Sequence, residues 1–179
     1  MDKAYTGVYI DSNIFTGYAR NQPNSSECKR LINLIVNKFS ESEKIKFFVW
    51  RFSGVEIASA LRRKKSRKDA EAFSFKKDSL WEKIFLPLPP NPKEKFEIKD
   101  FIRELIEIAL KFGTDFSDTI QTHSIETYKE QIDIIITEDK DYKNRLQKRY
   151  KRIKIYSLKD DICNILNKLH KNKENDAKK

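Results

Sequence analysis

Glycine and histidine are scarce in this chain of 179 residues, and each shortage argues against a class of function. The glycines are Gly7, Gly17, Gly54 and Gly113. Because they do not group into the loop that surrounds nucleotide phosphates, nucleotide-dependent enzymes and redox cofactors are disfavoured. A histidine-based ribonuclease needs two cooperating imidazoles, whereas this chain has only His123 and His170, which are far apart in sequence.

Cysteines and long apolar runs are also rare. Cys28 and Cys163 lie in apolar helical contexts without the spacing of a zinc site, which favours buried thiols in a reducing compartment over a disulfide. No stretch approaches the roughly 20 apolar residues that span a bilayer, and no long apolar run follows a basic N-terminus. We therefore expect a cytoplasmic protein with no membrane partner.

Positive charge is abundant and unevenly distributed. Lysine and arginine total 37 against 27 acidic residues, for a net charge of +10. Residues 62–68 contribute +6 and residues 140–154 contribute +7, which leaves a net −3 for the rest of the chain. Lysine and arginine that neutralise phosphates release condensed counterions, so this distribution suits a nucleic acid. Each basic run is equally well interpreted as a solvated helix face.

Predicted strands alternate with predicted helices. Strands are expected at residues 5–10, 47–50, 84–88, 132–136 and 153–156. Helices are expected to start near Ser25, Ser53, Asp100, Ser117 and Ser157, the last with Asp160 as its capping partner. Pro87 lacks a donor and belongs on a sheet edge. The pattern predicts one domain over residues 1–170, with a mostly parallel sheet between helices on both faces, and a disordered basic tail over residues 171–179.

Four acidic residues occupy positions that such a sheet brings to one edge. Asp11 ends the first strand, Glu56 follows the second, Asp118 starts a helix and Asp139 follows the strand near residue 136. Two carboxylates about 4 Å apart repel by roughly 4 kcal/mol at an effective dielectric near 20, so a cation is expected among them. Carboxylates suit Mg²⁺ or Mn²⁺, which activate water for phosphodiester hydrolysis.

These segments, read in order, resemble the motifs of PIN-domain nucleases. They are VYIDSN at 8–13, the helical Glu56, FSD at 116–118 and ITEDKDY at 136–142, within a match over roughly residues 5–165. The resemblance implies a three-layer α/β/α sandwich with about five parallel strands, a metal site of Asp11, Glu56, Asp118 and Asp139, and RNA as substrate. It also implies supporting roles for Asn13 and Thr137.

The same family includes VapC-type toxin nucleases, which makes an antitoxin protein and a second copy of the chain candidate partners. Two departures from the family pattern stand out. Ser12 replaces the commoner threonine, and residues 119–123, TIQTH, are more polar than usual. Neither departure removes a carboxylate.

Each acidic residue except Asp11 also has an ordinary structural interpretation. Ser53 and Glu56 have the spacing of a capping box, so Glu56 is equally well explained as the end of its helix. Asp118 has the position of a first-turn acid that the helix dipole favours. Its helix would then be capped by Asp115 or Ser117.

The turn after the fourth strand offers two acids for one role. Asp139 has the spacing of the family motif, Asp141 is its rival and is assigned a supporting role, and either fits a helix N-cap. A noncatalytic RNA-binding or interaction module on the same fold is the alternative function. Retention of every expected carboxylate argues against that alternative.

Two sets of basic residues are candidates for binding substrate. Arg63 and Arg67 follow Glu56 by seven and eleven residues, which places them on the same helix face, within reach of flanking phosphates. In the helix after Asp139, an apolar stripe is expected to be buried, leaving basic side chains for solvent or substrate. The expected stripe is Tyr142, Leu146 and Tyr150, and the basic residues are Lys143, Arg145, Lys148 and Lys151.

Overall fold

Five parallel strands form one sheet in the computed structural model, which describes residues 3–19, 25–50, 85–88, 98–112 and 115–176. The strands are β1 (Thr6–Ile10), β2 (Ile45–Trp50), β3 (Phe85–Leu88), β4 (Ile134–Ile136) and β5 (Lys154–Tyr156). Their order is β3-β2-β1-β4-β5, and every neighbouring pair is parallel. The predicted α/β class and parallel sheet are confirmed.

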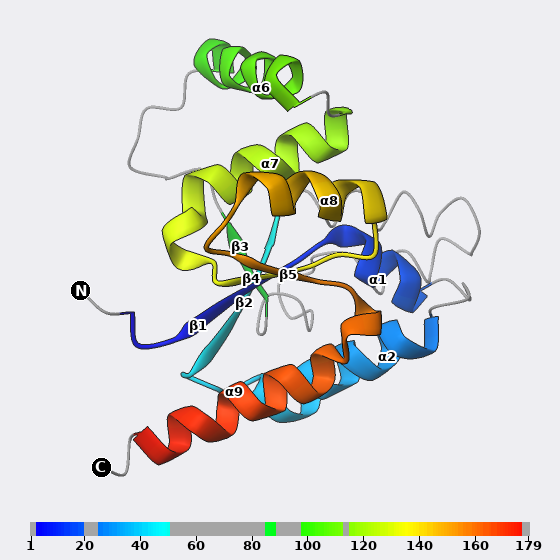
Figure 1. The fold of residues 1–179 in the computed structure, drawn as a ribbon, viewed down its shortest axis with the longest axis vertical. Helices are drawn as coiled ribbons and strands as arrows, with labels where there is room; N and C mark the ends of the chain where they lie inside the picture. Colours follow the sequence, from blue (N-terminus) through cyan, green and yellow to red (C-terminus); the bar gives the residue numbers. More distant parts are fainter. Residues whose placement is uncertain (1–2, 20–24, 51–84, 89–97, 113–114, 177–179) are drawn as a thin grey trace.

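Helices cover both faces of this sheet (Figure 1). They are α1 (Ser12–Ala19), α2 (Ser25–Leu34), α6 (Ile98–Phe112), α7 (Phe116–Tyr128), α8 (Lys140–Arg149) and α9 (Ile162–Asp176). The short segments between them are a π-helical turn at Ile35–Phe39 and 3-10 turns at Lys129–Gln131 (η2) and Leu158–Asp160 (η3). Helices α1, α2 and α9 lie on one side of the sheet, and α7 and α8 lie on the other.

Alternation of side chains along the strands builds two separate apolar cores. In β1, Val8 and Ile10 join the core under α2 and α9, whereas Tyr9 joins the core under α7 and α8. In β4, Ile135 lies on the opposite side from its two isoleucine neighbours. Because successive strand residues point to opposite faces, a strand that is apolar throughout is buried on both sides. The result is the three-layer arrangement expected from the sequence.

Strand β3 lies at the edge of the sheet, where Pro87 pairs in register with Val49 of β2. A proline contributes no N–H to the ladder, and an edge strand needs donors on one side only. The edge position predicted from Pro87 is confirmed.

Three local details differ from expectation. Helix α1 starts at Ser12, directly after β1, where only a turn was expected. Ser157 and Asp160 do form a capping box, but it caps the N-terminus of the short turn η3 and not that of the final helix. Asp161 then adopts a left-handed conformation with φ of 50°, which redirects the chain before α9 starts at Ile162.

The final helix is longer than predicted. Helix α9 continues to Asp176, so residues 171–176, expected to be a disordered tail, continue the helix. No glycine or proline interrupts that stretch, and lysine and glutamate are good helix formers. A charged composition alone was therefore a poor indicator of the helix end.

Helix α6 buries less of its apolar surface than its pattern predicts. Leu105 packs against the core on the α7 side, but Ile102, Ile106 and Leu110 are 49%, 53% and 81% exposed. These three residues follow one another at four-residue intervals, so they form a single exposed row. Within the described ranges, no helix is long and apolar enough to cross a membrane.

Both cysteines are free thiols inside the core, as expected. Burial, assisted by the charges of Glu138 and Glu27, raises the pKa of the Cys28 thiol to about 11. Since only the thiolate reacts readily, we predict that both cysteines of the native protein react slowly with a disulfide reagent at pH 8. In denaturant both thiols should react rapidly. A fast-reacting thiol in the folded protein would contradict the packing around these residues.

Candidate active site

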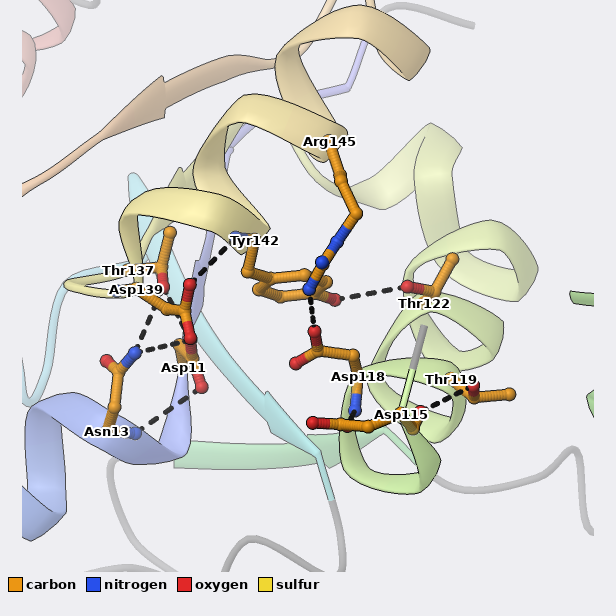
Figure 2. A network of polar contacts seen from close by, with 10 residues as sticks. All are labelled: Asp11, Asn13, Asp115, Asp118, Thr119, Thr122, Thr137, Asp139, Tyr142 and Arg145. Atoms are coloured by element: carbon orange, nitrogen blue, oxygen red, sulfur yellow. Dashed lines mark hydrogen bonds and ion pairs between the residues drawn. The ribbon is translucent and has the colours of Figure 1, made fainter. Parts of the chain in front are cut away.

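Asp11 is the buried centre of the polar cluster at the carboxyl edge of the sheet. Its N–H donates to the carbonyl of Ile136 at 3.0 Å, which places it at the carboxyl ends of β1 and β4. The residue is 3% exposed. Oδ2 accepts hydrogen bonds from Thr137 Oγ1 at 2.6 Å and Asn13 Nδ2 at 2.8 Å, and the contacts to Oδ1 are longer (Figure 2). A buried carboxylate with these donors is held in one orientation.

Thr137 connects the acids of this edge. Its hydroxyl donates to Asp11 and accepts from Asn13 Nδ2 at 3.1 Å and from the N–H of Asp139 at 3.1 Å. Asn13 also accepts from the N–H of Glu138 at 3.2 Å through Oδ1. Asn13 and Thr137 therefore link the residues that follow β1 to those that follow β4.

Replacing this hydroxyl tests its positioning role. We predict that Thr137→Val, which keeps the side-chain volume, destabilises the fold by about 2 kcal/mol, because buried partners lose their hydrogen bonds. Thr137→Ser retains the oxygen and serves as the matched control. Chemical denaturation measures the difference between the two variants. A Val variant as stable as the Ser variant would show that the hydrogen bonds contribute little.

Asp139 and Asp141 are distinguished by their contacts. Asp139 is the N-cap of α8, and its Oδ1 accepts from the N–H of Tyr142 at 2.8 Å. Its backbone N–H also donates to Thr137 Oγ1, whereas Asp141 is an exposed residue in the first turn of α8. Asp139 is thus both the N-cap of α8 and a neighbour of Asp11. Its interpretation as a helix cap and its interpretation as a member of the acidic site are therefore compatible.

Asp118 lies across the cluster and is paired with a residue that the sequence analysis left to solvent or substrate. Asp115 caps α7, with its Oδ1 accepting from the Asp118 N–H at 2.9 Å. The Asp118 carboxylate forms an ion pair with the guanidinium of Arg145 on α8. Burial, together with the charges of Asp115 and Asp139, raises the pKa of Asp118 to about 6, although Arg145 opposes the shift.

Arg145 is therefore part of the site, which corrects its expected place on the free basic face. Its guanidinium also lies 5.9 Å from the ring centre of Tyr142, and its Nε is buried without a hydrogen-bond partner among the described residues. Lys143 departs from that face as well, since it pairs with Asp160 at 2.6 Å, whereas the buried stripe of Tyr142, Leu146 and Tyr150 is confirmed. The sequence of α8 alone does not reveal which of its basic side chains faces α7.

Residues 119–123 of α7 are more polar than the family pattern because some of them belong to a buried hydrogen-bond network. Gln121 Nε2 donates to Ser12 Oγ, and Gln121 Oε1 accepts from Tyr9 Oη, both at 3.4 Å. Thr122 and Tyr142 share a hydrogen bond of 3.3 Å between their hydroxyl oxygens. Sequence reasoning missed Gln121 and Thr122, although the unusual polarity of residues 119–123 was the available signal.

The structure brings Asp11, Asp118 and Asp139 to the same sheet edge, around the Tyr142 side chain (Figure 2). Glu56, Arg63 and Arg67 lie outside the described residues. Among the residues that are described, no three acidic, histidine or cysteine side chains are close enough together to form a ready-made metal site. Thr137 bonds the carboxylate of Asp11 and the backbone N–H of Asp139, so these two residues are neighbours at that edge.

The chemistry of this pair fits a hard divalent cation. Mg²⁺ keeps several waters and is usually held by one or two carboxylates, so Asp11 and Asp139 are a sufficient protein contribution. Asp118 could join only if its ion pair with Arg145 opens. A divalent cation bound there would lower the pKa of a coordinated water, which is the chemistry that phosphate-ester hydrolysis requires.

Comparison with known proteins supports the fold. No protein-family model and no curated protein matches the sequence. Among solved structures, the chain is similar to one in the crystal structure of VapBC2 from Rickettsia felis bound to a DNA fragment from their promoter. The match covers 85% of this chain and 98% of that one, with a TM-score of 0.51 and 9% identity. This chain therefore has an α/β fold that resembles a chain of the VapBC2 complex.

Proposed function

We propose that this chain is a PIN-type ribonuclease that hydrolyses RNA phosphodiester bonds with Mg²⁺ or Mn²⁺. The observation that carries the proposal is the buried Asp11, joined through Thr137 to Asp139 and facing Asp118 across Tyr142. These three acids come from separate segments, in the order of the family motifs. The fold similarity to VapBC2 supports the same assignment.

Each residue has a role in this proposal. Asp11 and Asp139 would hold the metal, which when bound would lower the pKa of a coordinated water and stabilise charge on the phosphate. Asn13 and Thr137 keep the Asp11 carboxylate in its orientation by donating to Oδ2. Arg145 neutralises Asp118 until substrate or metal takes its place. Glu56 is proposed as the fourth acid, and Arg63 and Arg67 as phosphate contacts, from their sequence positions.

Metal removal tests this function. The purified chain should cleave a mixture of single-stranded and structured RNA in Mn²⁺ or Mg²⁺, lose the activity in EDTA and regain it when metal is added back. The noncatalytic alternative predicts that RNA binds but stays intact under every condition. Cleavage that continues in EDTA would refute the metal site while leaving a nuclease.

A second component of the proposal is a protein partner. The similarity to a chain of the VapBC2 complex favours a toxin of the VapC type, which would act in the cytoplasm and be held by an antitoxin. A homodimer is the other candidate assembly. Size-exclusion chromatography with light scattering distinguishes a monomer from a dimer. Arrest of growth on expression, with RNA cleavage in the same cells, tests the toxin role.

A further inference from the structure

A cavity of about 410 Å³ opens beside the candidate active site, at the carboxyl ends of β4 and β5. Thr137 and Asp139 of the site form part of its wall, and Ser157 at the start of the turn after β5 lies opposite. Its volume is within the range of small-ligand sites, roughly 300–1,000 Å³. In parallel α/β sheets, ligands bind beyond the carboxyl ends of the strands. The cavity is thus in the position where a substrate of this site would continue.

Three lysines line this cavity, and they differ in their partners. Lys143 contacts Asp160 at 2.6 Å, so its charge is neutralised within the protein. Lys140, the first residue of α8, and Lys159, in η3, are both exposed, and neither has an ionic partner within the described part of the chain. They come from segments 19 residues apart in sequence and meet at the same opening. Two cationic groups are therefore available to a ligand there.

The acids of the same wall are already engaged. Asp139 accepts from the N–H of Tyr142, and Glu138 accepts from the N–H of Leu158 at 2.5 Å. The three lysines of the wall outnumber these two acids, so the wall is cationic overall without a metal. A lysine ammonium is a compact point charge that suits a phosphate oxygen.

We infer that this cavity holds the RNA backbone phosphate next to the scissile one, through Lys140 and Lys159. The inference rests on the proposed function for the identity of the substrate. It assigns the two lysines to substrate binding, and it places the strand over the β4 and β5 ends, past Asp139. Lys140 and Lys159 then determine how tightly and in which direction the strand lies across the acids.

A second basic cavity provides a matched control. It measures about 400 Å³ and is lined by Lys151 and Arg152, but also by Asp133 and Ile153, which precede β4 and β5. It is therefore at the amino ends of the strands, on the far edge from Asp11 and Asp139. Removing two charges there alters the net charge of the protein by the same amount without touching the cavity beside the acids.

The test compares two double variants, Lys140→Gln with Lys159→Gln and Lys151→Gln with Arg152→Gln. Binding of a fluorescent 12-nucleotide single-stranded RNA is measured in EDTA over a series of salt concentrations, and cleavage is measured in Mn²⁺. For the first pair, we expect the Kd and the KM to rise about 25-fold, with kcat within twofold, since each of the two charges about 4 Å from a phosphate contributes a factor of roughly five. The salt slope should fall by about 0.7, the value for one neutralised phosphate in a single strand.

Each outcome decides the inference. A loss of affinity and salt slope confined to the first pair supports it. Equal losses in both pairs would show diffuse attraction to a basic protein and overturn it, as would no loss in either pair. If the wild type binds but never cleaves, the proposed function fails, while the comparison of Kd values still decides the role of the two lysines. Thermal melting of both pairs verifies that neither variant is unfolded.

Discussion

Asp11→Asn is expected to reduce metal-dependent RNA cleavage by roughly 100-fold or more, the largest effect on activity of any single substitution proposed. A metal contributes several kcal/mol of charge stabilisation to hydrolysis, and a loss of about 3 kcal/mol corresponds to roughly a factor of 100. The substitution is nearly isosteric and removes one negative charge from a buried ligand. The amide oxygen can still accept from Thr137, so the fold should persist. Initial rates in saturating Mn²⁺ measure the loss.

Asp133→Asn is the control for this variant. Asp133 lies before β4, at the opposite edge of the sheet, where its carboxylate accepts from the Gly7 N–H at 2.7 Å and pairs with Lys3 at 2.6 Å. The change therefore removes the same charge from a hydrogen-bonded aspartate outside the site. We expect it to cleave RNA at close to the wild-type rate. Comparable cleavage by the Asp11 and Asp133 variants would exclude Asp11 from the active site.

Gly7→Ala is expected to destabilise the protein by about 3 kcal/mol, the largest effect on stability proposed. A Cβ built on Gly7 would lie 1.7 Å from the carbonyl oxygen of Gln131 and 3.1 Å from the Phe48 ring. The nearer atom belongs to the backbone of η2, so no side-chain rotation relieves the contact. Strand β1 or the turn before β4 therefore has to move. Urea unfolding followed by circular dichroism measures the change.

Lys46→Ala is the companion of the glycine variant. Lys46 is the β2 residue in register with Gly7, but its side chain is exposed. Its Nζ lies over the Tyr5 ring, 4.4 Å from the ring centre. We expect a loss below about 1 kcal/mol, typical of surface positions. If Gly7→Ala were no more harmful than Lys46→Ala, the close approach of η2 to β1 would be wrong.

Local pattern in the sequence was enough to predict the sheet. Apolar runs bounded by polar residues identified all five strands, and Pro87 identified the edge, because hydrophobic alternation and a missing donor are local properties. The positions of Asp11, Asp118 and Asp139 followed from the strand ends and helix starts. In a parallel sheet, all carboxyl ends meet at one edge, so the gathering of these acids was predictable before any contact was known.

The partners of those acids depended on the tertiary structure. Nothing local to Asp118 or Arg145, 27 residues apart, indicates that α7 and α8 bring their charges together. The same holds for the hydroxyl of Thr137, which connects Asp11 to Asp139 only because β1 and β4 are neighbours. Periodicity determines which face of an element is apolar, but the order of strands and the packing of helices determine which polar groups meet.

The sequence thus determined that the acids gather at one edge of the sheet. The fold determined the hydrogen-bond and ion-pair partners of those acids. Composition and spacing placed carboxylates at the strand ends and a basic run directly after Asp139. Only the packing of α8 against α7 decided that Arg145 serves Asp118, while Lys140 and Lys159 remain available at the opening of the neighbouring cavity. The physical reason is that the residue type alone gives the charge of a side chain. Its nearest opposite charge belongs to an element that folding brings together from a distant part of the sequence.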